Sequence, residues 1–201
     1  MDPLVHIFGV YVVMHYAGAR PARIRRLVNL EGFGMPASRP AQAPRRLTQW
    51  LDELKQLRQG EISLKTYPDA DAVARRLTKT NPRLPADKAA WLARQWARPG
   101  ADGQWRILGD AAHKIVNPSL FRVDEMLALY AAITAPVLVI EGSDDSLSQW
   151  WKGRYSLGEF HERLKAVPVL SRQVLPDSGH MLHHDQPERL ARALEAFLDV
   201  P

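Results

Sequence analysis

The stretch APVLVIEGSDD, residues 135–145, places a run of apolar and mostly β-branched residues directly before a turn that carries carboxylates. Such a run is typical of a parallel strand that is buried on both faces. A second strand-like run, residues 172–175, leads into the turn PDSGH, which ends at His180. Helical spacing continues the pattern over residues 187–198, so the C-terminal part predicts alternating strands and helices of the α/β class.

Working outward, the rest of the chain divides into two parts. Residues 1–35 predict one helix and one strand of the same core, and residues 121–201 return to that core. Between them, residues 36–120 open with a proline-rich passage and then show helical spacing, clearest over residues 47–57. Apart from a short extended piece at residues 105–108, no strand is expected there, so we predict a helical insertion. Three sheet strands are expected in all, at residues 26–31, 136–141 and 172–176.

Composition narrows the classes of chemistry. The chain has 201 residues and no cysteine, which excludes disulfides, thiolate zinc sites, iron–sulfur clusters and a cysteine nucleophile. The formal net charge is +5, but the basic residues are scattered and accompany no nucleic-acid-binding motif. We therefore expect no nucleic-acid partner.

The N-terminal segment is apolar over residues 3–16 but does not fit a targeting sequence. Asp2 stands where a signal peptide carries Lys or Arg, and Arg20 ends the run before it reaches the roughly 20 apolar residues of a membrane span. We expect no membrane partner and a soluble, cytoplasmic protein.

Polar groups at two strand ends could act together. Neighbouring parallel strands lie about 5 Å apart, so a carboxylate in the turn after residue 140 and His180 in the next turn can meet. A carboxylate in that place orients an imidazole and stabilises its protonated form, which is the supporting half of a nucleophile–histidine–acid system.

The segment from Ala135 to Val200 resembles the C-terminal end of the α/β-hydrolase superfamily, a fold with a mostly parallel sheet, flanking helices and a helical cap insertion. The resemblance implies that Asp145 is the acid, with Asp144 the weaker choice, and that His180 is the base. It further implies hydrolysis of an ester or related acyl bond of a small apolar substrate by a serine-type mechanism, without metal or cofactor.

The chain departs from that family at the nucleophile. The family motif G-x-S-x-G is absent, and Ile7 stands at the position of the serine, so no nucleophile is identified. The strands and oxyanion loop that precede the motif would lie before Met1, which makes the chain similar to a truncated hydrolase in which residues 1–11 are diverged or foreign. The alternative function is therefore a non-catalytic remnant, or an interaction module that keeps the scaffold.

Three further expectations follow from particular residues. Trp150 and Trp151, just beyond the acid turn, are candidates for the substrate pocket. Metal-dependent hydrolysis through His180, His183 and His184 remains a third possibility, although we predict no metal site. Because three strands alone leave the first without a neighbour, we expect a second copy, a complementing chain or the apolar N-terminus to cover the open sheet edge.

Overall fold

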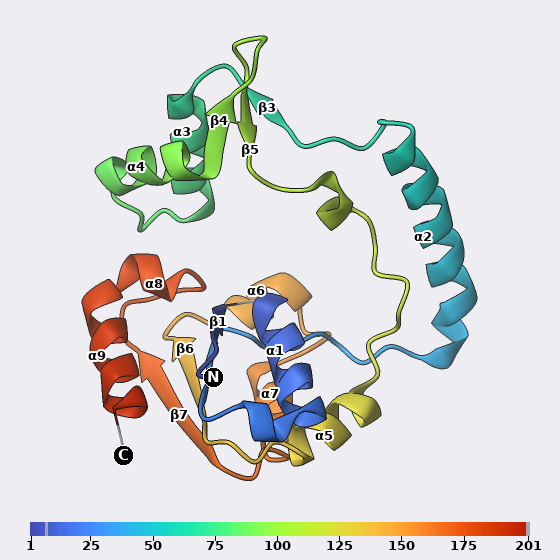
Figure 1. Ribbon diagram of the computed structural model, residues 1–201, viewed down its shortest axis with the longest axis vertical. Coiled ribbons are helices and arrows are strands. Elements are labelled where there is room, and N and C mark those ends of the chain that lie inside the picture. Colours follow the sequence, from blue (N-terminus) through green and yellow to red (C-terminus); the bar gives the residue numbers. More distant parts are fainter. Residues whose placement is uncertain (7, 200–201) are drawn as a thin grey trace. The chain divides into compact units, whose positions relative to one another are not determined.

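The computed structural model describes residues 1–6 and 8–199 of the chain. It divides into two compact units (Figure 1). The core unit combines Met1–Ser38 with Phe121–Pro201, and the inserted unit is Arg39–Leu120.

The core unit is built on a parallel sheet, which confirms the predicted α/β class. Its strands are β1 (Leu4–His6), β2 (Leu27–Leu30), β6 (Val137–Gly142) and β7 (Leu170–Leu175), in the spatial order β1-β2-β6-β7. All three pairings are parallel. The register places Leu27 opposite Val137 and Leu30 opposite Ile140.

The expectation of only three strands is wrong, because the sheet has a fourth strand. The N-terminal segment forms β1 and pairs with β2, so that Leu4 lies opposite Val28 and His6 opposite Leu30. Of the three covers expected for β2, the structure therefore uses the chain's own N-terminus. A strand of three residues is too short to show alternation in the sequence, which is why β1 was not predicted.

Helices cover both faces of this sheet. They are α1 (Phe8–Ala19), α5 (Val123–Ala131), α6 (Ser146–Trp151), α7 (Leu157–Leu164), α8 (Leu182–Asp185) and α9 (Pro187–Leu198), with a 3-10 turn at Pro21–Arg23. The helices α1, α5 and α7 pack on one face in a cluster with Leu27, Val137 and Val139, whereas α8 and α9 pack on the other with Leu138 and Ile140. Successive residues of a strand point to opposite faces, so the continuous apolar run of β6 fills both cores.

The inserted unit is helical, as expected, but also contains a small sheet. Its helices are α2 (Ala43–Arg58), α3 (Ala70–Thr80) and α4 (Ala86–Trp96), with 3-10 turns at Pro40–Gln42 and Ala111–Lys114. Its strands β3 (Thr66–Tyr67), β4 (Ala97–Pro99) and β5 (Trp105–Ile107) form an antiparallel sheet in the order β3-β5-β4. Only β5 falls on the extended piece predicted at residues 105–108, because β3 and β4 are again too short to show a period.

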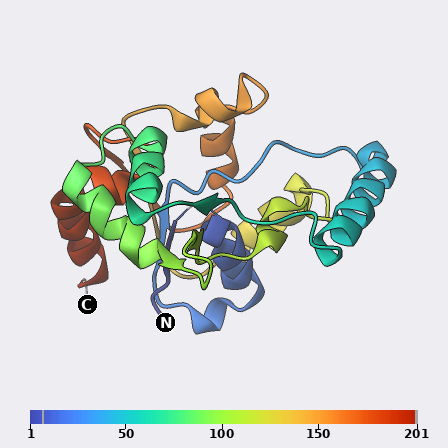
Figure 2. The same ribbon diagram turned by 90° about the horizontal axis from the view of Figure 1, so that it is seen from above.

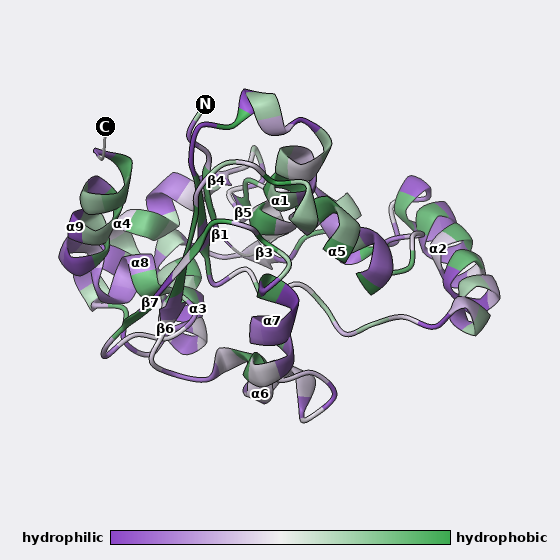
Figure 3. Ribbon diagram, turned by 90° about the horizontal axis from the view of Figure 1, so that it is seen from below, coloured by the Kyte–Doolittle hydropathy of each residue, from purple (hydrophilic) through white to green (hydrophobic). Residues whose placement is uncertain are grey.

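Within the inserted unit, α3 and α4 pack side by side (Figure 2), and α2 is amphipathic (Figure 3). The apolar period predicted over residues 47–57 accounts for α2, although none of its residues is fully buried. Over the described residues, no helix has the length and apolar character needed to cross a membrane.

The contact between α1 and α5 gives a direct test of the core packing. A Cβ at Gly18 would press on the carbonyl of Leu129, at 2.7 Å from its carbon and 2.9 Å from Cα. Backbone atoms cannot move aside like a flexible side chain, so Gly18→Ala should lower the free energy of unfolding by about 1–3 kcal/mol, measured by urea denaturation. Gly9→Ala in the same helix is the control, because its Cβ would meet Val5 at an ordinary 3.5 Å. Equal effects of the two substitutions would contradict this packing.

Candidate functional site

The site is organised by Glu31, the residue that follows β2. Its side chain is buried, at 1% exposure, and its φ of 54° lies in the left-handed region that non-glycine residues seldom occupy. One carboxylate oxygen, Oε1, accepts a hydrogen bond of 2.5 Å from the backbone N–H of Gly142, at the end of β6. The other, Oε2, lies 3.1 Å from Nδ1 of His180. Glu31 therefore joins the ends of β2 and β6 to the histidine loop.

Two hydrogen bonds from backbone N–H groups also join the turn after β6 to the histidine loop. Asp144 N–H donates to the carbonyl oxygen of Ser178 over 3.0 Å, and Ser178 N–H donates to Oγ of Ser143 over 3.2 Å. A Cβ at Gly142 would lie 2.7 Å from the carbonyl oxygens of Ser178 and Gly179, so this close approach requires glycine.

Three different groups hold His180. Glu31 contacts Nδ1, and Trp150 packs against the ring in a T-shaped arrangement with a centroid distance of 4.1 Å. The backbone of the same residue is held by His6, whose Nε2 lies 2.8 Å from the His180 carbonyl oxygen. A carbonyl only accepts, so His6 carries its proton on Nε2. A carboxylate accepts, so Nδ1–H of His180 donates a hydrogen bond to Glu31, and Nε2 is the ring nitrogen that carries no proton in this tautomer.

An apolar cavity of about 200 Å³ adjoins this pair. Glu31 forms part of its wall, and aromatic or aliphatic side chains form most of the remainder. The lining residues are Tyr11, Glu31, Phe33, Gly34, Met35, Leu147, Trp150 and Trp151. Both tryptophans predicted from the sequence therefore line the cavity that contains the carboxylate.

Asp145, the acid implied by the family resemblance, lies elsewhere. Its Oδ1 accepts from Ser148 N–H at 2.9 Å and its Oδ2 from Ser148 Oγ at 2.5 Å, so this exposed side chain caps α6. In this structure the carboxylate in contact with His180 is Glu31. Sequence reasoning missed Glu31 because it treated the residue as the end of a strand, although a carboxylate at a strand end is the same signal that pointed to Asp145.

The described residues place no hydroxyl nucleophile on the His180 ring. In the described part of the chain, no serine, threonine or tyrosine hydroxyl hydrogen-bonds to the His180 ring. Ile7, which the sequence aligns with the missing serine, lies outside the described residues. The strand β1 ends at His6, and the helix α1 begins at Phe8.

Two histidines beside the site, His6 and His183, are held as neutral rings. His6 packs against His183 with a centroid distance of 4.5 Å, and burial lowers the pKa of each from 6.5 to about 4. His183 and His184 lie on the helical turn α8, not in the loop expected before α9. Among the described residues, no three His, Cys, Asp or Glu side chains are arranged to hold a metal ion.

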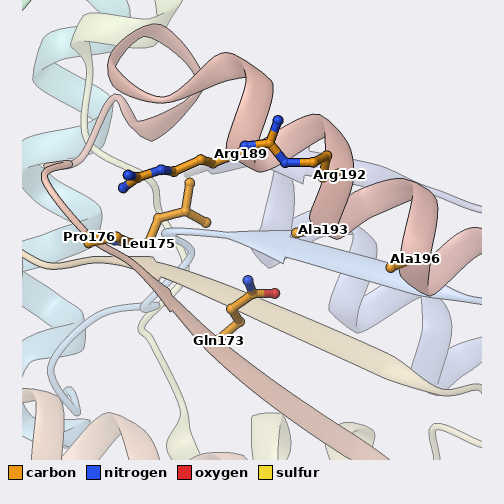
Figure 4. Close-up of a pocket in the computed structure, with 7 residues that line it drawn as sticks. All are labelled: Gln173, Leu175, Pro176, Arg189, Arg192, Ala193 and Ala196. Atoms are coloured by element: carbon orange, nitrogen blue, oxygen red, sulfur yellow. The ribbon is translucent and has the colours of Figure 1, made fainter.

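A second cavity, of about 380 Å³, lies between β7 and α9 (Figure 4). Its lining residues are Gln173, Leu175, Pro176, Arg189, Arg192, Ala193 and Ala196. Since they include no histidine, carboxylate or hydroxyl, this cavity offers no acid, base or nucleophile for the chemistry at His180.

Comparison with known proteins identifies a family for this chain. Residues 6–193 match the model of the Alpha/beta hydrolase family. No curated protein matches the sequence.

Solved structures share the fold at low sequence identity. The hypothetical protein PA1622 from Pseudomonas aeruginosa PAO1 is 23% identical with a TM-score of 0.83, and the match covers 100% of this chain and 68% of that one. E-2-(acetamidomethylene)succinate hydrolase is 22% identical with a TM-score of 0.70, covering 99% and 66%. The thioesterase domain from the curacin biosynthetic pathway is 23% identical with a TM-score of 0.74, covering 95% and 63%. The chain thus spans about two thirds of the length of these proteins.

The lowered pKa values of the partly buried His6 and His183 determine how stability should depend on pH. Because the folded pKa of His6 and His183 is about 4 and the unfolded value is 6.5, the unfolded chain binds protons first as the pH falls. Their contribution is complete above pH 6.5 and is lost toward pH 4. In the wild type, the free energy of unfolding should fall between pH 7 and pH 5. In the double variant His6→Gln/His183→Gln, we expect this fall to be smaller by about 2 kcal/mol, a value that allows for the partial solvent exposure of the two rings.

Urea denaturation at the two pH values measures this difference. His113→Gln is the matched control, since His113 is an exposed residue of the inserted unit. An unchanged pH dependence in the double variant would show that the two rings are not buried as neutral groups.

Proposed function

The chain belongs to the alpha/beta hydrolase family, and on that premise we propose that His180, Glu31 and the adjoining cavity form an acyl-ester site whose nucleophile position is held by Ile7. The observation that carries the proposal is the 3.1 Å contact between Glu31 Oε2 and His180 Nδ1 beside an apolar cavity. As it stands, the chain would bind small apolar esters without serine-type turnover.

The residues present supply the base and the acid of the reaction. In a serine-type mechanism a hydroxyl attacks the ester carbonyl, a histidine removes the hydroxyl proton, and the same histidine returns it to the leaving alkoxide. Nε2 of His180 suits this exchange, because Glu31 engages Nδ1 and stabilises the imidazolium that forms. An isoleucine side chain has no lone pair, so residue 7 cannot supply the nucleophile that attacks the ester carbonyl.

The cavity favours a short apolar acyl or aryl group. Its volume of about 200 Å³ limits the length of the group, and its wall of Phe33, Leu147, Trp150 and Trp151 offers little to a polar substituent. A small apolar ester, the substrate class given with the family resemblance, is therefore the substrate that we propose.

Restoring the hydroxyl is the decisive experiment. We expect wild type and His180→Ala to hydrolyse p-nitrophenyl acetate at the same background rate. Ile7→Ser should exceed that rate at least 10-fold, and the gain should vanish in Ile7→Ser/His180→Ala. A fluorophosphonate should label Ile7→Ser at residue 7, as shown by mass spectrometry, but should not label the Ile7→Ala control.

Two outcomes would overturn the proposal. Hydrolysis by wild type that depends on His180 would mean that an activated water or another nucleophile already serves the site. Absence of both labelling and turnover in a folded Ile7→Ser chain would favour the alternative of a non-catalytic interaction module. The exposed apolar side chains at one edge of the core unit, Leu4, Val12 and Tyr16, suit such a role.

The choice of acid is tested in the same Ile7→Ser background. We expect Glu31→Gln to lower the labelling rate at least 100-fold, because the imidazolium loses its carboxylate. Glutamine keeps an acceptor for Gly142 N–H, so the fold should persist. Asp145→Asn should change the rate less than threefold, since asparagine caps α6 equally well. The reverse order of effects would make Asp145 the positioning acid.

A further inference from the structure

The inserted unit carries the positive charge of the protein. Residues 39–120 hold 15 of the 27 Lys and Arg residues but 8 of the 22 Asp and Glu residues, a net charge of +7 against +5 for the whole chain. The core unit is therefore slightly acidic, at −2. The scatter of basic residues along the sequence hides this segregation.

A cavity of about 650 Å³ in the inserted unit gathers four of these cations. Lys65 precedes β3, and Arg75, Arg76 and Lys79 lie on α3. No carboxylate lines the cavity among the described residues. Asp69 caps α3 through Ala72 N–H and lies 3.9 Å from one nitrogen of Arg75. In the described part of the chain, Lys65, Arg76 and Lys79 form no ion pair with a carboxylate.

Tyr67 supplies a second, independent feature of the same cavity. The side chain lines the cavity and is buried, at 4% exposure, yet its hydroxyl finds no hydrogen-bond partner in the described structure. Lys65 Nζ and Arg76 Cζ lie over its ring, 5.7 and 6.0 Å from the centroid. The ring therefore holds two cations beside the cavity, and a buried donor lacks its acceptor.

We propose that this cavity binds the phosphate groups of a small ligand, of the pyrophosphate class. Phosphate oxygens match the planar fork of an arginine and accept from lysine and tyrosine, and a multiply charged anion uses several cations at once. A single carboxylate would leave most of that charge unmatched. A compact cavity with one aromatic ring suits a small polyanion better than a nucleic-acid strand, which binds along a groove with several stacking rings.

Calorimetric titration of the full chain with sodium pyrophosphate at low salt tests the site. Arg76→Gln/Lys79→Gln should weaken binding at least 10-fold. Arg58→Gln/Lys88→Gln removes the same charge from elsewhere on the inserted unit and should change the affinity less than twofold. Tyr67→Phe should weaken binding several-fold without loss of thermal stability, since it removes a hydroxyl that has no partner. His180→Ala should bind as wild type does, which separates this site from the proposed ester site.

Three results would overturn the proposal. One is equal weakening by the two double variants, which would reduce the effect to net charge. Another is equal affinity for citrate and pyrophosphate, which would remove the preference for phosphate. The third is tighter binding of a short oligonucleotide than of pyrophosphate, which would make the surface a nucleic-acid site.

Discussion

The buried carboxylate of Glu31 is the constraint on which the geometry of the core site depends. Burial of a carboxylate costs several kcal/mol unless hydrogen bonds replace its lost water. Both oxygens are engaged here, one by the N–H of Gly142 and the other by the ring of His180. The left-handed backbone at Glu31 adds strain, about 1 kcal/mol or more for a residue with a Cβ. The surrounding contacts must outweigh both costs, so the position of the carboxylate is firmly determined.

Parallel strand order explains why the polar groups meet at all. The four strands run in the same direction, so their carboxyl ends share one edge of the sheet. Each end contributes a group close to it in sequence: His6 from β1, Glu31 from β2, the turn at Gly142 from β6 and His180 from the loop after β7. This arrangement thus brings together residues that lie far apart in the sequence. His6 and His180 are separated by 174 positions.

Several features of the fold could be predicted from the sequence, and others could not. The α/β class, the buried strand β6, the long helices and His180 were predictable because each shows a local period or turn signal. Glu31 was not, because its role depends on β2 lying next to β6, a pairing between residues about 110 positions apart. The resemblance pointed instead to Asp145, whose local motif is equally consistent with the helix cap that the structure shows. The short strands β1, β3 and β4 carry too few residues for any pattern to emerge.

The contacts that support His180 do not require a nucleophile. Glu31 closes the turn after β6, Trp150 packs against the imidazole, and His6 holds the backbone of the same loop. Each of these interactions stabilises the folded core whether or not a hydroxyl stands at residue 7. A chain that lacks the serine can therefore keep the histidine–carboxylate pair and the cavity intact. It follows that the pair is part of the architecture of this fold and is not by itself evidence of turnover.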